Sequence, residues 1–399
     1  MSRPFSFQGC TPAEAGFDPA GLARLAARFS REIDNGVLPG AVVLLVRGGR
    51  RVLFEAWGRQ DPARPTPMAR DAVFRIYSMT KPIVSLAAMM LIEEGLCQLG
   101  DPVARYLPEF AHSKVYAPEG GASQAPTRPA TVQDLLRHTA GLALEIVGDT
   151  PVHRMYADAG LGGRRHDNAE SARIIAGLPL LFPPGKVWEY SRATDVLGRL
   201  IEVLGGQTLG EFLRARIFAP LAMVDTGFFV PEAAHHRIAE PHANDPESGT
   251  PVRLMDLRKP MAWEGGSGGL ASTAYDYALF LQCLLDGGAL AGTRLVAPST
   301  VALMTADHLG PIRANPDTSS ATLLPPGHGF GLGFAVRTQA GIAPFPGNVG
   351  TYYWGGLGGT HFFVDPALDL FGILMAQAPM QRDRYRVMFR NLVYAAIVD

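Results

Sequence analysis

The chain has 399 residues, of which 47% are hydrophobic and 18% charged, a balance that excludes intrinsic disorder and suffices for one large or two medium-sized domains. Its 36 Lys and Arg residues are offset by 37 Asp and Glu residues. Without a basic field we expect neither a nucleic-acid partner nor a charged membrane-binding surface.

Two further features concern the cellular compartment. The N-terminal segment MSRPFSFQGCTPAEAGFDP contains no apolar run of the kind that a secretory signal needs. Cys10, Cys97 and Cys283 lie far apart, with neither a CxxC pair nor metal-ligand spacing. A sparse, odd number of cysteines is typical of a reducing compartment, so we predict a cytoplasmic protein as encoded.

The first third of the chain combines helix and strand patterns. Residues 18–35 have helical periodicity with an acidic start. Residues 40–58, GAVVLLVRGGRRVLFEAWG, are typical of two strands joined by a glycine-containing turn. Residues 74–95 predict a short strand or loop that runs into a strongly apolar helix, which we expect in the core.

The middle and the end of the chain differ in their secondary-structure patterns. From residue 101 to about 255, helical patterns such as VQDLLRHTAGL, AESARIIAGL and DVLGRLIEVLGGQTLGEFLRARIF alternate with Pro- and Gly-rich loops. A loop entering a helix follows from Gly265. Strand patterns return at residues 330–338 and 351–379, and a last helix is expected from about Arg382 to Ile397.

These elements predict an α+β/α fold, with a central antiparallel sheet flanked by helices. Residues 1–100 and 260–399 would form the domain that contains the sheet. Residues 101–259 would form a mainly helical inserted domain, and the active site would lie in the cleft between the two.

Ser78 and Lys81 form an S-x-x-K pattern that places both side chains on one face of a helical turn. Proline is tolerated in a first helical turn, so Pro82 predicts a helix beginning near Ser78. The field at a helix N-terminus and burial both favour the neutral amine of Lys81, which suits a general base. A serine hydroxyl needs such a base to act as a nucleophile, and the Ser78 N–H would help hold an oxyanion.

Other patterns have ordinary explanations. A four-residue pattern with two fixed positions recurs by chance, and the alternative for Ser78 is an N-capping serine beside an exposed lysine. Gly265–Gly269 matches the G-x-S-x-G nucleophile elbow around Ser267, but KPMAWEG ahead of it is a poor strand. We assign His138 a structural role in orienting a loop. His235, His236 and His242 lack acidic companions, so we expect no metal and no cofactor.

Five blocks in consistent order resemble the serine β-lactamase-like superfamily, and within it the class C-related esterases called family VIII carboxylesterases. The resemblance spans about residue 15 to the C-terminus and implies a β-lactamase/penicillin-binding-protein-like fold. The blocks are FRIYSMTKPIVSLAAMMLIEEGLCQLGDPVARYLPEF, LLRHTAGL, FPPGKVWEYSRATDVLGRLIE, GGSGGLASTAYDYALFLQ and WGGLGGTHFFVDP.

The resemblance implies specific roles. Ser78 and Lys81 match the family's S-x-x-K, and Tyr190 matches the tyrosine of its Y-x-N. Trp354-Gly355-Gly356 replaces its K-T-G, and Leu357, the next residue, would supply the second oxyanion N–H besides that of Ser78. Because a phenol and an amine close together titrate as a coupled pair, the choice between Lys81 and Tyr190 as the base stays open.

Two departures from the family pattern bear on the substrate. Arg192 replaces the Asn that helps hold a substrate amide in penicillin-recognising relatives, and Trp354 replaces a Lys that would meet a substrate carboxylate. Arg192 would face an anionic group or, by preference, form an internal ion pair. Tyr77 would line the pocket or pack in the core, and His361 would contact substrate or pack at the strand edge. The substrate-binding candidates are therefore Trp354, Gly355, Gly356, Tyr77, Arg192 and His361.

We expect a carboxylesterase that hydrolyses small, short-acyl esters through an acyl-enzyme. Acyl transfer to an alcohol is the alternative within the same mechanism. Hydrolysis of β-lactams or D-Ala-D-Ala peptides is a second alternative, and Trp354 and Arg192 argue against it. A non-catalytic binding module is a third, but the serine, lysine and tyrosine are all present. Acyl length, physiological substrate and oligomeric state stay open.

Overall fold

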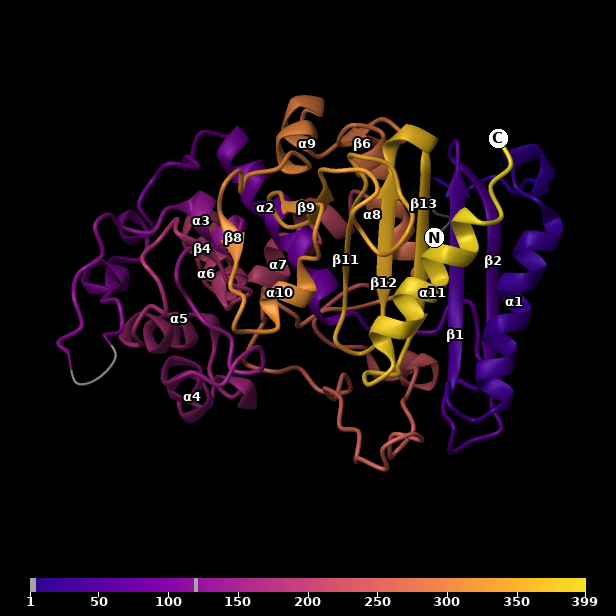
Figure 1. The fold of residues 1–399 in the computed structure, drawn as a ribbon, viewed down its shortest axis with the longest axis horizontal. Coiled ribbons are helices and arrows are strands. Elements are labelled where there is room, and N and C mark those ends of the chain that lie inside the picture. The colour runs from indigo at the N-terminus through magenta and orange to yellow at the C-terminus, as the bar shows by residue number, and fades with distance from the viewer. Residues whose placement is uncertain (1–4, 118–120) are drawn as a thin grey trace.

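The computed structural model describes residues 5–117 and 121–399 (Figure 1). Its helices are α1 (Pro19–Asp34), α2 (Thr80–Glu93), α3 (Val132–Leu136), α4 (Pro151–Asp158), α5 (Asn168–Gly177), α6 (Ala193–Gly205), α7 (Leu209–Leu213), α8 (Ala274–Leu285), α9 (Pro298–Met304), α10 (Ser320–Leu323) and α11 (Arg382–Tyr394). Its strands are β1 (Gly40–Arg47), β2 (Arg50–Gly58), β3 (Phe74–Arg75), β4 (Val187–Trp188), β5 (Ala271–Ser272), β6 (Ala289–Leu290), β7 (Thr293–Arg294), β8 (Arg313–Ala314), β9 (His328–Phe330), β10 (Ala335–Arg337), β11 (Tyr352–Gly355), β12 (His361–Asp365) and β13 (Leu370–Ala376).

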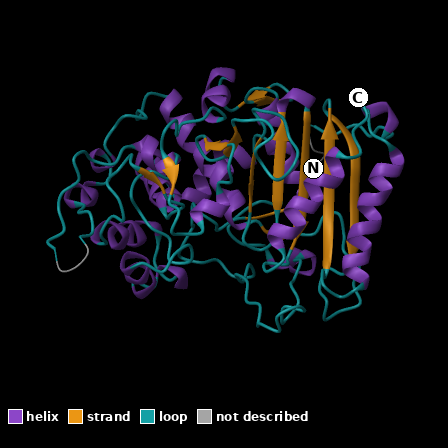
Figure 2. Ribbon diagram, viewed as in Figure 1, coloured by secondary structure: helices purple, strands orange, loops and turns teal. Residues whose placement is uncertain are grey.

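A seven-stranded antiparallel sheet forms one side of the molecule (Figure 2). Its strand order is β2-β1-β13-β12-β11-β10-β9, so the N-terminal hairpin joins the C-terminal meander where β1 pairs with β13. The register places Ala41 opposite Ala376 and Arg47 opposite Leu370. The predicted antiparallel sheet built from both ends of the chain is confirmed.

Helices cover both faces of this sheet. Residues of a strand point alternately to opposite faces, and every residue of β1 from Gly40 to Val46 is buried, so neither face is open to water. Helices α1 and α11 pack against each other, with α1 on β2 and α11 on β13, while α8 packs on β1 and β13. In Figure 1, α11 lies in front of the sheet and α8 behind it.

Helix α2 joins the sheet to the helical region. Twelve of its residues, Thr80 to Leu91, are buried, because α6 and α7 pack on it in addition to the residues from the sheet side. Helices α3 and α5 in turn pack on α6.

The predicted domain boundaries stay a prediction. Among the described helices, none combines the length and the hydropathy that crossing a bilayer requires.

A helix begins near Ser78, as predicted, because the 3₁₀ helix Tyr77–Met79 leads directly into α2 at Thr80. Two other predicted helix ends were wrong. The helix expected over VQDLLRHTAGL ends at Leu136, since His138 adopts a left-handed conformation with φ of 58°. Helix α11 ends at Tyr394 rather than at Ile397.

Candidate active site

A pocket of ≈ 520 Å³ lies where the nucleophile segment, the helical region and the end of β11 meet. Of the sequence-predicted site residues, Gly356 alone is not part of its lining. A Cβ on Gly356 would lie 2.3 Å from the Ile76 carbonyl oxygen, so glycine allows β11 to end close to the nucleophile segment. The predicted residues that line the pocket are Tyr77, Ser78, Lys81, Tyr190, Arg192, Trp354, Gly355, Leu357 and His361.

The backbone directly before Ser78 is constrained. Tyr77 is buried and has φ of 43°, a left-handed conformation that costs a bulky residue roughly 1–3 kcal/mol. Its hydroxyl accepts a 2.9 Å hydrogen bond from the Met255 N–H, and the Ile76 N–H donates to the Leu270 carbonyl at 3.1 Å. These contacts on both sides hold the turn that presents Ser78 to the pocket.

Lys81 lies between Ser78 and Tyr190. Its Nζ is 3.4 Å from Ser78 Oγ, which is long for a hydrogen bond, as is common in a site without substrate. The same amine is 4.4 Å from the centroid of the Tyr190 ring and is almost fully buried. The structure therefore brings the serine, lysine and tyrosine together in one pocket.

Tyr190 is in contact with the tryptophan that replaces the family's lysine. Trp354, on β11, donates a 3.3 Å hydrogen bond from Nε1 to the Tyr190 hydroxyl oxygen. The two ring centroids are 5.3 Å apart. An indole can only donate, so this bond leaves the phenol proton of Tyr190 directed at another acceptor.

His138 holds the segment that carries Tyr190. Its Nδ1 accepts a 3.3 Å hydrogen bond from the Ser191 N–H, and its carbonyl accepts one of 3.0 Å from the Glu189 N–H. Burial, and secondarily the charge of Lys81, hold the pKa of His138 well below 6.5. The imidazole is therefore neutral near pH 7 and acts as a fixed acceptor under the tyrosine loop.

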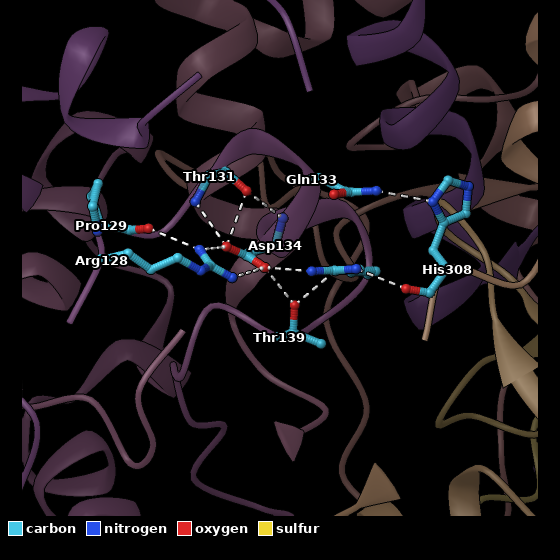
Figure 3. A network of polar contacts seen from close by, with 8 residues as sticks. Arg128, Pro129, Thr131, Gln133, Asp134, Thr139 and His308 are labelled. Atoms are coloured by element: carbon cyan, nitrogen blue, oxygen red, sulfur yellow. Dashed lines mark hydrogen bonds and ion pairs between the residues drawn. The ribbon is translucent and has the colours of Figure 1, made fainter. Parts of the chain in front are cut away.

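A buried carboxylate, that of Asp134, anchors the backbone turn that carries His138 (Figure 3). Arg128, Arg137, the Thr131 N–H and the Thr139 hydroxyl all donate to it. Burial alone would raise the pKa of Asp134, but these hydrogen bonds outweigh it and hold the pKa at about 2. The charged carboxylate thus holds the residues on both sides of α3 through hydrogen bonds.

Ser267 contributes its backbone rather than its hydroxyl. Its carbonyl oxygen accepts a 2.7 Å hydrogen bond from Lys81 Nζ, while its own N–H and Oγ donate to Asp195 at 2.9 and 2.8 Å. The residue lies in a turn that no strand precedes. A Cβ on Gly266 would lie 2.2 Å from the Thr194 carbonyl oxygen, which explains a glycine there. The turn that contains Ser267 therefore positions the Lys81 amine. It is not a nucleophile elbow, because that motif requires a strand directly before the serine.

Arg192 is committed to internal ion pairs. Its Nε donates to Glu145 at 3.0 Å, its Nη2 also contacts Glu145, and its Nη1 donates to Asp195 at 3.2 Å. Burial disfavours the guanidinium, but Asp195 and Glu145 outweigh it and raise the pKa of Arg192 above its ordinary value. Since Asp195 also holds Ser267, this arginine connects the pocket wall to the support of Lys81.

His361 lies at the start of β12, where its Cα pairs with that of Gly355. The side chain is buried, and within the described residues neither ring nitrogen makes a hydrogen bond of ordinary geometry. Burial, followed by the charges of Arg386 and Arg390, holds the pKa of His361 well below 6.5. The pocket wall therefore contains a buried, neutral imidazole.

Leu357 follows β11 at the rim of the pocket, and the residue is 38% exposed. In the described part of the chain its N–H has no hydrogen-bond acceptor, as an oxyanion donor requires. The sequence interpretation missed Arg164, Trp263, Leu144 and Glu145, which also line the pocket. They lie on irregular loops, where no periodicity or motif marks them.

The described residues contain no group of three or more His, Cys, Asp or Glu side chains that could hold a metal ion. The arrangement, a serine beside a buried amine and a phenol in a partly apolar pocket, is suited to attack on a carbonyl group and transfer of its acyl part.

The chain is similar to known hydrolases. The family model described as Beta-lactamase matches residues 25–395. Protein Rv1367c of Mycobacterium tuberculosis is 35% identical over 87% of this chain and 88% of its own length. Esterase EstB of Burkholderia gladioli is 33% identical over 96% of this chain and 98% of its own. Among solved structures, EstCE1, described as a hydrolase with promiscuous acyltransferase activity, superposes with a TM-score of 0.79 at 29% identity, covering 94% of this chain and 99% of its own.

Proposed function

The chain is a serine hydrolase that belongs to the Beta-lactamase family, and from that premise we propose that it cleaves small carboxylic esters through a covalent acyl-enzyme on Ser78. The observation that carries the proposal is the position of Lys81. Its amine lies 3.4 Å from Ser78 Oγ and 4.4 Å from the centre of the Tyr190 ring. One amine therefore lies beside both the nucleophile and the ring of Tyr190.

In the acylation step, Ser78 Oγ attacks the ester carbonyl while its proton passes to the Lys81–Tyr190 pair. The Ser267 carbonyl fixes the Lys81 amine at 2.7 Å, and the Trp354 indole fixes the Tyr190 oxygen at 3.3 Å. The proton acceptors are thus held in place before substrate arrives.

The negative charge on the former carbonyl oxygen would be held by the N–H groups of Ser78 and Leu357. The pair then returns the proton to the departing alcohol, and the acyl group stays on Ser78. Water, deprotonated by the same pair, attacks the acyl-enzyme and releases the carboxylic acid. Each proton taken from a nucleophile is returned to a leaving group, so the enzyme ends in its starting state.

The shape of the pocket supports a small ester as the substrate. A cavity of ≈ 520 Å³ is in the range for a small organic ligand. Trp354 presents a flat aromatic wall, and Leu144, Leu161 and Trp263 add apolar surface. Arg192, which stands where penicillin-recognising relatives carry an amide, is occupied by Glu145 and Asp195. These features favour esters over β-lactams and peptides.

Acyl transfer to an alcohol is the second candidate. It is favoured by the likeness to EstCE1, which is described as a hydrolase with promiscuous acyltransferase activity. The acyl-enzyme is common to both reactions, and they differ only in whether water or an alcohol attacks it.

The test uses p-nitrophenyl esters with acyl chains of two to eight carbons, assayed with and without a short alcohol as acceptor. We expect release of p-nitrophenol that is fastest for short acyl chains, with free acid as the main product. A new ester as the main product would favour transfer over hydrolysis. Turnover of nitrocefin that rivals that of the best ester would overturn the proposed substrate class.

The proposal includes a cytoplasmic location and no need for a cofactor, nucleic acid or membrane. These points rest on composition and cysteine usage. Activity that survives extensive dialysis against EDTA supports independence from metal ions. Loss of activity on EDTA treatment, restored by a divalent cation, would contradict it.

A further inference from the structure

Arg164 lines the pocket from the loop that precedes α5. Its guanidinium carbon lies 5.8 Å from the ring centroid of Tyr77 and 5.4 Å from that of Trp263. Within the described residues the guanidinium makes no ion pair and no side-chain hydrogen bond. Five N–H donors on a half-buried cation are therefore held beside two aromatic rings without a protein acceptor.

Within the described residues, Arg164 differs from the other arginines of the pocket lining in having no carboxylate partner. Four arginines line the pocket, and three of them are paired with carboxylates. Arg192 is paired with Glu145 and Asp195, and Arg382 and Arg386 are both within ion-pair distance of Asp383. Arg382 and Arg386 share this one carboxylate. Among the described residues, Arg164 is the arginine of the pocket lining that has no carboxylate partner.

The location of Arg164 ties this charge to substrate. Tyr77 is the residue directly before the nucleophile, and Trp263 is a buried pocket residue, so the guanidinium lies on the wall of the space that the substrate must enter. A cation in a concave site that is partly shielded from water attracts anions more strongly than one on an open surface. Its planar fork is suited to a carboxylate in a bidentate arrangement.

We propose that Arg164 recognises a carboxylate on the substrate, so that the preferred substrates are half-esters of dicarboxylic acids rather than uncharged esters. The inference rests on the proposed function, because the ester group must reach Ser78. The inference specifies the chemical class of the group at the end of the substrate that lies away from the reacting ester. Arg164 is a specificity residue and takes no part in proton transfer.

The experiment compares two substrates of the same length. One is the mono-p-nitrophenyl ester of glutaric acid, which carries a free carboxylate, and the other is its methyl ester, which carries none. The ratio of their kcat/KM values is measured for the wild type, Arg164→Gln, Arg164→Lys and the control Arg165→Gln. Arg165 is exposed and does not line the pocket. Succinic and adipic homologues repeat the comparison at other lengths.

In the wild type we expect the ratio to favour the charged ester at one or more of the three lengths. Arg164→Gln should lower that ratio by about tenfold, mainly through KM, as expected for loss of a charge-assisted contact. Arg164→Lys should retain part of the preference for the charged ester, and Arg165→Gln should retain all of it. Added salt should lower the wild-type ratio of the two kcat/KM values towards that of Arg164→Gln. A ratio that is the same in the wild type and in Arg164→Gln at all three lengths would overturn the proposal.

The two proposals fail in different ways. Turnover of the methyl ester reports the esterase function alone, so its absence would contradict the proposed function. Recognition of the carboxylate is then still measurable by calorimetry, as binding of monomethyl glutarate to the Ser78→Ala and Ser78→Ala/Arg164→Gln proteins. Weaker binding to the double variant supports the role of Arg164, and equal binding overturns it.

Discussion

The indole Nε1 of Trp354 donates a hydrogen bond of 3.3 Å to the hydroxyl oxygen of Tyr190. Two residues 164 positions apart in the sequence are thus joined at the atom that is proposed to exchange protons with Ser78. A donor at a phenol oxygen stabilises negative charge there. The tryptophan that replaces the family's lysine therefore has a polar contact as well as an aromatic surface.

Replacement of Trp354 by Phe keeps an aromatic wall and removes the donor. We expect kcat for a short p-nitrophenyl ester to fall by about tenfold, the effect of one lost hydrogen bond of about 1–1.5 kcal/mol. In a Tyr190→Phe background the same substitution should have almost no further effect, because the acceptor is already absent. Additive losses in the double variant would show that Trp354 acts through packing instead.

Replacement of Lys81 by Met and of Tyr190 by Phe should each lower kcat by at least about 100-fold, because each removes a group that moves protons in both half-reactions. Steady-state rates with p-nitrophenyl acetate measure the loss, and circular dichroism checks that the fold is retained. A folded variant with more than a tenth of wild-type kcat would remove that residue from the mechanism.

Ser267→Ala tests the support of Lys81. The contact with Lys81 uses the Ser267 carbonyl oxygen, which alanine also provides, whereas the hydroxyl binds Asp195. We therefore expect a loss of about 1 kcal/mol in the free energy of unfolding and a decrease in kcat of less than about tenfold. Activity abolished in Ser267→Ala but retained in Ser78→Ala would transfer the nucleophile to the other serine.

Buried histidines make stability depend on pH. Burial holds the pKa of His138 and His361 well below 6.5 and that of His328 at about 4, so they stay neutral in the native state. The unfolded chain binds protons at these positions below about pH 6.5, so the native state loses stability as the pH falls, by up to about 1.4 kcal/mol per pH unit for each histidine.

Urea unfolding at several values between about pH 7 and 5.5 measures this dependence. The window lies above the range in which Asp134, with its pKa at about 2, loses its charge. We expect a lower free energy of unfolding at the acidic end and a shallower slope for His361→Gln. Equal slopes in the wild type and the variant would show that His361 binds protons to the same extent in the native and unfolded states.

Part of the site could be predicted from the sequence, and the reason is local geometry. Ser78 and Lys81 are one helical turn apart, so their spacing alone brings them together. Tyr190 and Trp354 are far from them in the chain, and only the family resemblance indicated their roles. The antiparallel sheet was predictable because its strands show apolar runs at both ends of the chain.

The hydrogen bonds that position the site residues could not be predicted, because backbone atoms make them. The Ser267 carbonyl that holds Lys81 and the Ser191 N–H that bonds His138 carry no residue-type signature. The same is true of the left-handed conformation of Tyr77, a residue whose hydroxyl accepts a hydrogen bond from the distant Met255 N–H. Arg164 lies on a loop between helices, where neither periodicity nor spacing indicated that its side chain faces the pocket.

Labelling with a p-nitrophenyl phosphonate ester followed by peptide mapping tests the central claim most directly. Attack by the activated nucleophile forms a stable phosphonyl adduct on one residue. We expect a single adduct on the peptide that contains Ser78, formed at a rate that falls sharply in Lys81→Met. An adduct on Ser267, or equal labelling rates with and without Lys81, would contradict the account.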